Sequence, residues 1–345
     1  MTPEIMARLR DAGLFRFCVP RSIGGLEGTP DRLLTVVEEL ATADAATAWS
    51  VMIGATSGMA SGHLAPDVAR SIYGDREAIS VGPFAPLGKA GREGDGFRLT
   101  GRWPYVSMCQ DATWFMGGGV TDDGRRLLFL FPADRARIHD TWKVMGLRAT
   151  GSHDIEVESH WVPQEYTIPL QCDRPFADGQ LYRFPVLGMI AAAIAAAALG
   201  LARGAVQDIL DLAGVKTPTY AVRRLEERPL VQLQIGQAQA EVRAARAFLR
   251  EAVDEAWSRA VSSGGVDLPA RAALRQAAAH ATGAAAKAVD LMYTLGGGTS
   301  NFEHSPLQRR FRDVHAVTQH VMVGQTVMET VGRLMLGFKV DPGQL

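Results

Sequence analysis

Cysteine, net charge and nucleotide-binding motifs are all scarce in this chain. Its 345 residues include three cysteines, and 36 Lys and Arg nearly balance 37 Asp and Glu. Three scattered cysteines without motif spacing argue against a disulfide framework and indicate a reducing compartment. A formal net charge of −1 provides no basic field to attract nucleic acid. The chain also lacks a GxGxxG or GxxxxGK[ST] motif, so neither dinucleotide fingerprint nor P-loop is expected.

A membrane span and a signal peptide are not expected either. The N-terminal sequence MTPEIMARLRDAGLF carries acidic residues and no long apolar run. The most apolar stretch, residues 186–202, is dominated by alanine and is shorter than the ~20 strongly apolar residues that a span needs. We interpret it as a helix buried among other helices, in a soluble cytoplasmic protein.

The hydrophobic periodicity changes twice along the chain. Apolar residues recur at helical spacing near the N-terminus, alternate in GFRLTGRWPYVSM, RRLLFLFPA and HDIEVESHWVP, and return to helical spacing from about residue 175. Alternation in the last strand predicts Ile155, Val157 and Trp161 on one buried face. Because helices, strands and helices follow one another in blocks, an alternating doubly wound fold is not expected.

Two histidines on RRFRDVHAVTQHVMVGQ, residues 309–325, raise the question of a metal site. The pattern predicts a single amphipathic helix, with Ser305 as a cap and Pro306 at its first position. A spacing of five between His315 and His320 rotates the second ring by about 140°. Zincin-type pairs use a spacing of four, and no third ligand is near, so no metal is expected. The charged first turn alone is typical of a solvated face.

Three further stretches combine chemistry-bearing residues. GRWPYVSMCQDATW offers Trp103, Tyr105 and Trp114 as an aromatic wall beside Ser107, although such a strand is more often simply core. RATGSHD supplies hydrogen-bond donors, including Arg148, for a phosphate or ring system, or is a plain hairpin connection. LGGGTS allows a close backbone approach before a helix start, or is simply a turn.

Together these stretches resemble the acyl-CoA dehydrogenase superfamily over nearly the whole chain. The resembling sequences are FCVPRSIGGLEG, GRWPYVSM, MGLRATGSHDIEVESHWVP, ERPLVQLQIGQAQAEVRAAR and YTLGGGTSNFEHSPLQRRFRDVHAVTQH. Within that superfamily the likeness is greatest to two-component flavin-dependent monooxygenases. Dehydrogenases carry a catalytic glutamate in a YEGT motif shortly after the RD pair. Here that place holds Val321, which cannot remove a proton, and the oxygenase branch has a histidine at the position of His320.

The resemblance implies an α+β, mainly α fold with three parts. These are an N-terminal helical domain (residues 1–76), a central β barrel-like domain (77–172) and a C-terminal four-helix bundle (173–345) that assembles homotetramers. Flavin is expected between the β domain and the bundle, with a neighbouring subunit completing the site.

The resemblance also implies site residues. His320 and Ser107 are expected to be catalytic, His320 as base or hydrogen-bond partner and Ser107 beside the flavin N5 edge. The expected cofactor-binding residues are Trp103, Ser107, Arg148, Ser152, Arg224, Gln232, Gly297 and Gly298.

The implied function is a monooxygenase that uses reduced flavin (FMN or FAD) and O₂, through a C4a-peroxyflavin, to oxygenate a small electron-rich or heteroatom-containing substrate. A separate flavin reductase is the expected partner. Ala55 and Thr56 stand where several phenol hydroxylases have a histidine, and Gly82 stands near an expected hydroxyl, which weakens the case for a phenol substrate. The alternatives are a dehydrogenase or oxidase with a relocated base and a non-enzymatic scaffold.

Overall fold

The computed structural model describes residues 1–170 and 175–345. Its N-terminal helices are α1 (Pro3–Asp11), α2 (Pro30–Ala43), α3 (Ala45–Ser57) and α4 (Pro66–Tyr73). The strands are β1 (Ser80–Val81), β2 (Gly88–Glu93), β3 (Gly96–Val106), β4 (Trp114–Thr121), β5 (Arg126–Pro132), β6 (Arg137–His139), β7 (His153–Pro163) and β8 (Thr167–Pro169). The C-terminal helices are α5 (Val186–Val215), α6 (Pro229–Ser262), α7 (Leu268–Gly296), α8 (Pro306–Thr318) and α9 (Thr326–Met335).

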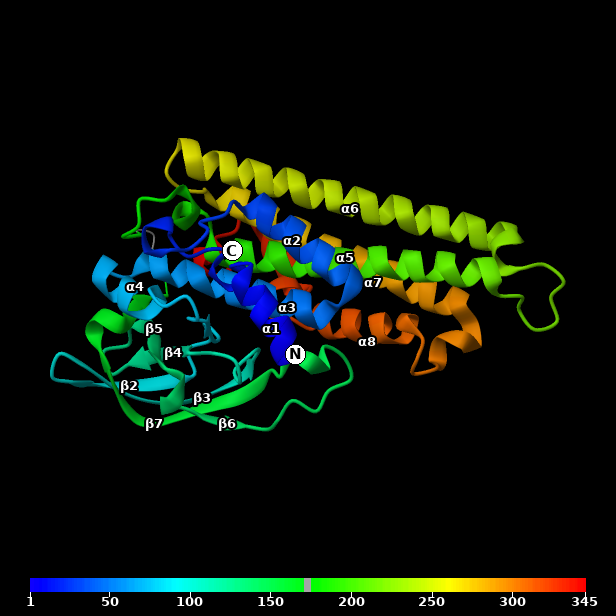
Figure 1. Cartoon of the computed structure of the whole chain (residues 1–345). Helices are drawn as coiled ribbons and strands as arrows, with labels where there is room; N and C mark the ends of the chain where they lie inside the picture. The colour runs from blue at the N-terminus through cyan, green and yellow to red at the C-terminus, as the bar shows by residue number, and fades with distance from the viewer. Residues whose placement is uncertain (171–174) are drawn as a thin grey trace.

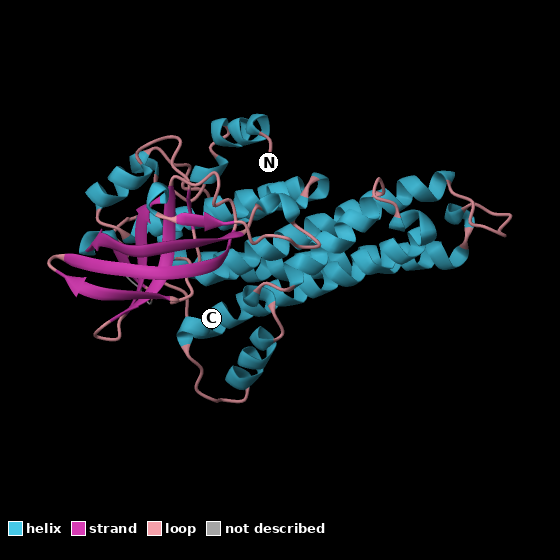
Figure 2. Cartoon of the chain, turned by 90° about the horizontal axis from the view of Figure 1, so that it is seen from below, coloured by secondary structure: helices cyan, strands magenta, loops and turns pink. Residues whose placement is uncertain are grey.

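The expected α+β, mainly α architecture is confirmed. The expected boundary at residues 172–173 and Cys172 lie outside the described residues. The strands form one sheet in the order β6-β7-β3-β2-β4-β5-β8, with β1 added against β4. Figure 1 shows the sheet at one end of a long helical bundle, with α3 between the sheet and α5. Seen from below, the C-terminal segment lies along the flank of the bundle (Figure 2).

The alanine-rich helix α5 is the centre of the bundle. It packs against α2, α6, α7 and α8, and 83% of its most apolar window is buried inside the protein. Alanine side chains are short enough for neighbouring helix axes to approach closely, which explains why so apolar a helix fits a packed core. The helix is long and apolar enough for a membrane span, contrary to the length expected from the sequence, but it is a core helix, as its alanine content indicated.

One strand prediction needs correction. Ile155 and Val157 are buried as expected, but Trp161 is half-buried and Val162 is buried instead. The β3–β7 register shifts between Leu99 and Gly101, and Ser159 opposite has a left-handed φ of 49°. Because a bulge inserts an extra residue, the alternation changes phase beyond it.

The predicted helix over residues 309–325 is shorter than expected. Helix α8 follows Ser305, whose side chain makes no capping hydrogen bond, and it ends at Thr318. His320 then begins a separate 3₁₀ turn, η10 (Val321–Val323). The chain direction changes between the two histidines, so they do not share one helix.

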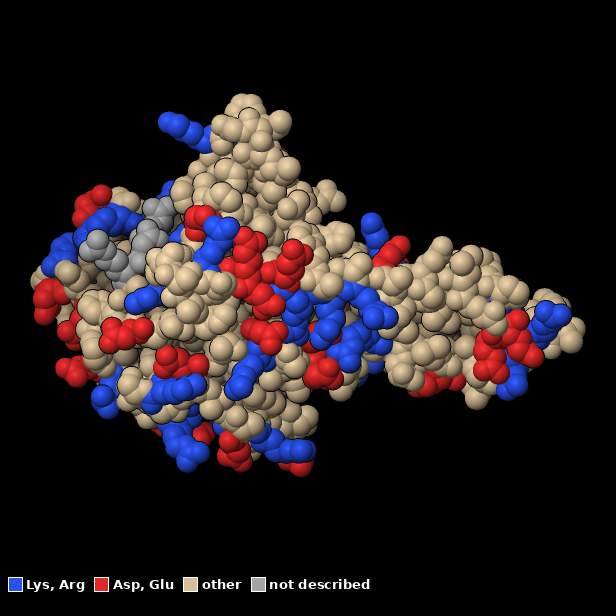
Figure 3. Space-filling view, turned by 90° about the horizontal axis from the view of Figure 1, so that it is seen from above, with Lys and Arg blue, Asp and Glu red and all other residues tan. Residues whose placement is uncertain are grey.

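Charged side chains of both signs are interspersed on the surface. On the face seen in Figure 3, blue and red groups alternate around the middle of the molecule and at the far tip of the bundle. Below the surface, Glu38 is buried at 1% exposure and pairs with Arg203, Arg246 and Arg250. These pairs tie α2 to α5 and α6.

Candidate active site

A large cavity lies between the sheet and the helices. It has a volume of about 1280 Å³ and is bounded by α3, the loop after β1, the end of β3, the start of α5 and the segment around His320. A single small ligand typically occupies ~300–1,000 Å³. The cavity is therefore larger than a pocket for one small ligand usually is.

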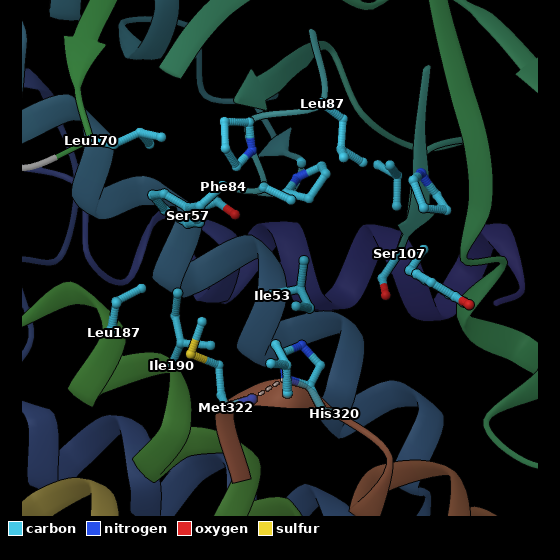
Figure 4. A pocket seen from close by; sticks show the side chains of 18 of the residues that line it. Ile53, Ser57, Phe84, Leu87, Ser107, Leu170, Leu187, Ile190, His320 and Met322 are labelled. Atoms are coloured by element: carbon cyan, nitrogen blue, oxygen red, sulfur yellow. Dashed lines mark hydrogen bonds between the residues drawn. The ribbon is translucent and has the colours of Figure 1, made fainter. Parts of the chain in front are cut away.

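The inner wall of the cavity is apolar and carries few polar groups. The residues labelled in Figure 4 are Ile53, Ser57, Phe84, Leu87, Ser107, Leu170, Leu187, Ile190, His320 and Met322. Three charged side chains, Arg125, Arg126 and Asp341, also border the cavity in the described part of the chain, and all three are exposed. Charge is thus confined to the solvent side.

Ser107 reaches the cavity because strand β3 ends in a distorted turn. The β3–β7 register shifts between Trp103 and Val106, and Tyr105 and Met108 on either side of Ser107 have left-handed φ angles of 64° and 60°. Residues with large side chains rarely adopt this conformation, and such strain is concentrated at functional sites. The turn leaves Ser107 at 5% exposure with its hydroxyl directed into the cavity (Figure 4).

A chain of hydrogen bonds runs from α3 through Ser107. The Trp49 indole Nε1–H donates to Ser107 Oγ at 3.0 Å. Ser107 Oγ lies 2.8 Å from Ser152 Oγ, which lies 2.7 Å from Thr150 Oγ1. Thr150 Oγ1 donates to the Leu147 carbonyl oxygen at 2.8 Å. Four side chains from three segments therefore form one connected polar network in a buried position.

His320 lies across the cavity from Ser107 (Figure 4). Its Nδ1 accepts a hydrogen bond from the Met322 backbone N–H at 3.2 Å, and its ring meets the Trp49 ring edge-on at 5.6 Å between centroids. Since Nδ1 accepts, we assign the proton of the neutral ring to Nε2. Nε2 has no hydrogen-bond partner in the part of the chain that the structure describes. It is therefore a donor available to a ligand.

The surroundings of His320 favour its neutral form. Burial, and to a smaller extent the positive charge of Arg275, lower the pKa of His320 to about 4. Arg275 is itself buried at 3% exposure and donates to the carbonyl oxygens of Met322 and Gln344. Near pH 7 His320 is thus an uncharged N–H donor, and no described lining carboxylate bonds to it.

The structure brings some of the expected site residues together and separates others. Ser107, Ser152 and His320 all line the cavity. Trp103 does not line the cavity. It is fully buried in the core of the β domain, where its indole N–H donates to the Gly118 carbonyl oxygen. Arg148 is exposed in a 3₁₀ turn and does not border the cavity.

The expected aromatic wall does not form. The register shift after Trp103 leaves Tyr105 at the rim of the cavity with 74% exposure, against the ring of Trp142, whereas Trp114 stacks on Tyr166 elsewhere. A regular strand would have kept Trp103 and Tyr105 on one face, so the bulge is the reason for the difference.

The remaining expected cofactor residues lie at the far end of the bundle. Gly297 and Gly298 follow α7, and Lys216 donates to the neighbouring Gly296 carbonyl and to Thr299. At the same end, Arg224 donates to the Gly214 carbonyl, and Gln232 donates to the Glu226 carbonyl. Ile190 of α5 lines the cavity and the helix ends at Val215, so about 38 Å of helix, at 1.5 Å per residue, separates this group from the cavity. These residues cannot reach the cavity of their own subunit.

Several lining residues could not be identified from the sequence. Trp49 was the most informative one missed, because its N–H bonds Ser107 and its ring contacts His320. The signal for it is a single tryptophan within the run of small residues AATAWS, since a buried indole N–H usually needs a hydrogen-bond acceptor. Ile190 and Met322 carry no comparable signal.

His315 is part of a different cluster. Its Nε2 lies 2.8 Å from Asp290 Oδ1, its ring packs against Phe311, and it does not border the cavity. Across residues 1–170 and 175–345, no group of three His, Cys, Asp or Glu side chains is arranged to hold a metal ion.

Comparison with known sequences places the chain among flavoenzyme relatives. The family models "Acyl-CoA dehydrogenase, N-terminal domain" and "Acyl-CoA dehydrogenase, C-terminal domain" match residues 1–65 and 192–325. An indole-3-acetate monooxygenase of Pseudomonas putida is 30% identical over 99% of this chain and 89% of the relative. The oxygenase subunit HsaA of a flavin-dependent monooxygenase of Rhodococcus jostii is 28% identical over 92% of this chain and 86% of the relative.

A solved structure agrees over the full length. The crystal structure of 3-HSA hydroxylase from Rhodococcus sp. RHA1 superposes with a TM-score of 0.92 at 25% identity, covering 100% of this chain and 92% of that one.

Proposed function

Because the chain belongs to the acyl-CoA dehydrogenase family, in its branch of flavin-dependent monooxygenases, we propose that the cavity beside Ser107 and His320 binds reduced flavin together with an organic substrate. The protein is the oxygenase component of such an enzyme. The observation that supports the proposed site best is the cavity itself, since its 1280 Å³ exceeds the usual size of a single-ligand pocket and both Ser107 and His320 border it.

The residues present suit a flavin. Ser107 provides a buried hydroxyl oxygen with one lone pair unused by the protein, and the apolar walls suit a flat ring system. Ser107 would hold the ring on the β-domain side, with Ser152 hydrogen-bonded behind it. Reduced flavin supplies the two electrons that let O₂ place one oxygen atom on a substrate and release the other as water. The apolar wall excludes bulk water from this chemistry.

His320 acts as a neutral hydrogen-bond donor in this proposal. Its Nδ1 is occupied by the Met322 N–H, and its low pKa keeps the ring uncharged. The Nε2–H can therefore stabilise negative charge that develops on an oxygen or nitrogen atom of the substrate. The base role considered from the sequence would require the proton to move to Nδ1 and the Met322 bond to break.

The substrate is proposed to be apolar and uncharged at its reacting end. The inner wall offers Ile53, Leu187, Ile190 and Met322, while charged side chains stand only on the solvent side. Burying an unpaired charge against this wall would be strongly unfavourable. A fused aromatic or heteroaromatic ring fits these surroundings.

The far cluster of Arg224, Gln232, Gly297 and Gly298 supports a shared site in a homotetramer. About 38 Å of helix α5 separates these residues from the cavity of their own chain, so they can serve a flavin only in a neighbouring subunit. We further propose a cytoplasmic enzyme that receives reduced FMN or FAD from a separate reductase.

A relocated catalytic base has little support. A dehydrogenase needs a carboxylate directed at the substrate. Val321 occupies the family position and is 69% exposed, and Asp341 is the one carboxylate among the described lining residues, on the exposed side.

The test is an anaerobic titration with reduced FMN and reduced FAD, followed by reaction with ¹⁸O₂ in the presence of indole as a probe. We expect saturable binding of one reduced flavin and one ¹⁸O atom in the product. Indole is a probe of the proposed apolar substrate class. Absence of reduced-flavin binding, or bleaching of bound oxidised FAD by an acyl thioester, would overturn the proposal.

A further inference from the structure

The hydrogen-bond chain beside the cavity has a fixed direction. Thr150 Oγ1 lies 2.8 Å from the Leu147 carbonyl oxygen, and two oxygens at that distance require a proton between them. The single hydroxyl proton of Thr150 must point there, because a carbonyl cannot donate. Thr150 can then only accept from Ser152, which lies 2.7 Å away.

The same reasoning fixes Ser107. Ser152 has given its proton to Thr150, so at 2.8 Å it must accept the proton of Ser107. Ser107 also accepts from the Trp49 indole, which can only donate. Its proton and one lone pair are thereby used, and one lone pair remains. Ser107 therefore presents an acceptor, not a donor, to the cavity.

The end of the chain is held firmly. The Leu147 carbonyl oxygen also accepts the Trp142 indole N–H at 3.0 Å, and the Leu147 backbone N–H donates to the Asp313 carboxylate at 2.7 Å. Leu147 has a left-handed φ of 51°, so its carbonyl is held in an uncommon direction by the surrounding structure. Reversal of the chain would leave two oxygens facing each other at Thr150.

Reduced and oxidised flavins differ in whether the ring offers a hydrogen-bond donor to such an acceptor. The central ring of reduced flavin carries a hydrogen on N5, whereas N5 of oxidised flavin is a bare acceptor. An acceptor opposite N5–H makes a hydrogen bond, but an acceptor opposite bare N5 leaves two buried lone pairs unsatisfied. The direction of the chain thus distinguishes the two redox states.

From this we infer that Thr150 and Ser152 are positioning residues that orient the Ser107 hydroxyl so that the cavity selects reduced over oxidised flavin. The inference rests on the proposed function, in which flavin lies against Ser107. Neither residue needs to touch the flavin through its own proton. Selection by proton direction also favours release of the flavin after it has been reoxidised, which frees the cavity for the next reduced molecule.

The experiment measures flavin affinity in both redox states rather than turnover. Dissociation constants for reduced and oxidised flavin are measured anaerobically for the full-length wild type and for Thr150→Val, Thr150→Ser and Ser152→Ala. We expect wild type to favour reduced flavin by at least about tenfold, as when one buried hydrogen bond is made in only one state. That ratio corresponds to a midpoint potential of bound flavin about 30 mV above that of free flavin.

The variants distinguish the effect of the Ser107 hydroxyl direction from the effect of side-chain shape at position 150. Thr150→Val keeps the shape but frees Ser152 and Ser107 to turn, so the ratio should fall towards one, mainly through tighter binding of oxidised flavin. The Leu147 carbonyl keeps its bond from Trp142, which favours normal folding. Thr150→Ser retains the hydroxyl and should retain the wild-type ratio. Ser152→Ala should lower the affinity ratio as Thr150→Val does. It provides an independent measurement if the valine variant is unstable.

Failure of the inference and failure of the proposed function give different results. A wild type that binds neither redox state contradicts the proposed function. A wild type that binds both states equally, or Thr150→Val and Ser152→Ala variants that keep the wild-type ratio, contradicts the inference and leaves the proposed function standing.

Discussion

At the scale of single residues, the cavity pairs one donor with one acceptor. The Nε2–H of His320 is available because Met322 occupies Nδ1, and the lone pair of Ser107 is available because its proton points to Ser152. Both assignments follow from groups that can play one role only: the Met322 N–H and the Trp49 indole can only donate, and the Leu147 carbonyl can only accept. Polar recognition in this cavity is thus set by the neighbours of His320 and Ser107 as much as by these residues themselves.

His320→Gln and His320→Ala distinguish a donor from a base. Glutamine offers an N–H but cannot accept a proton near pH 7, and alanine offers neither. If His320 donates, product formation should fall by ~10²-fold or more in the alanine variant and clearly less in the glutamine variant. Single-turnover product yield with saturating reduced flavin measures this, and equal losses in both variants would favour a base.

His320 should also make folding sensitive to acid. Its pKa is lowered from 6.5 to about 4 in the folded protein, mainly by burial. Between these values the unfolded chain binds a proton that the folded chain does not, so stability is lost as the pH falls from 6.5 towards 4. From pH 7.5 to 5.0 we expect a loss of ~2 kcal/mol from this residue.

Urea unfolding at pH 7.5 and pH 5.0 measures the effect. The difference between the two pH values should be smaller in His320→Gln than in wild type. His304→Gln, at an exposed position, is the control and should behave as wild type. The same pH dependence in wild type and His320→Gln would show that the ring is protonated as readily in the folded protein as in the unfolded chain.

At the scale of elements, close helix packing holds the site together. The start of α5 supplies Leu187 and Ile190 to the cavity, and farther along α5 crosses α2 where Gly200 faces the Glu38 carbonyl. A Cβ at Gly200 would come to 2.6 Å from the Ala41 Cβ, in addition to its clash with that carbonyl. The glycine is therefore required by the helix separation and not by its φ angle.

Gly200→Ala should destabilise the protein although alanine is the better helix former. Overpacking a tight contact costs ~1–3 kcal/mol, and the gain in helix propensity offsets less than about 1 kcal/mol of that. Gly283→Ala in α7, where a Cβ meets nothing within 4 Å, is the matched control and should be neutral or stabilising. Thermal unfolding of both variants gives the comparison, and equal behaviour would mean that α2 and α5 separate easily.

At the scale of the whole molecule, the two groups of expected cofactor residues lie at opposite ends of the bundle. The cavity is formed at the sheet end. The connection from α7 to α8, which contains Gly297 and Gly298, lies at the far tip of the bundle (Figure 1). Closed homo-oligomers commonly bring different ends of neighbouring chains together. A shared site explains both groups with one cofactor.

Hybrid oligomers test this sharing. His320→Ala disables the cavity, and Gly298→Leu should block the approach of a neighbouring flavin without disturbing its own chain, since a Cβ there meets nothing within 4 Å. In a random equal mixture about a quarter of the sites combine an intact cavity with an intact tip. Co-refolded or co-expressed mixtures should therefore regain activity that neither variant has alone, whereas a site within one chain predicts no gain.

The sequence by itself determined the fold and much of the chemistry. Block-wise periodicity separated helices from strands, and alanine content identified 186–202 as a core helix, because burial patterns depend on local residue types. The motifs around Ser107, Ser152 and His320 indicated the family and three residues that line the cavity.

Only the tertiary structure decided how those residues act. The bulge that buries Trp103 and exposes Tyr105, the end of α8 at Thr318 and the bond between Trp49 and Ser107 all depend on contacts between segments far apart in the chain. Proton direction at Ser107 and the neutral state of His320 are likewise properties of neighbours in space. Residue type and spacing carry no information about such neighbours, because hydrogen-bond direction and burial are fixed only when the chain has folded.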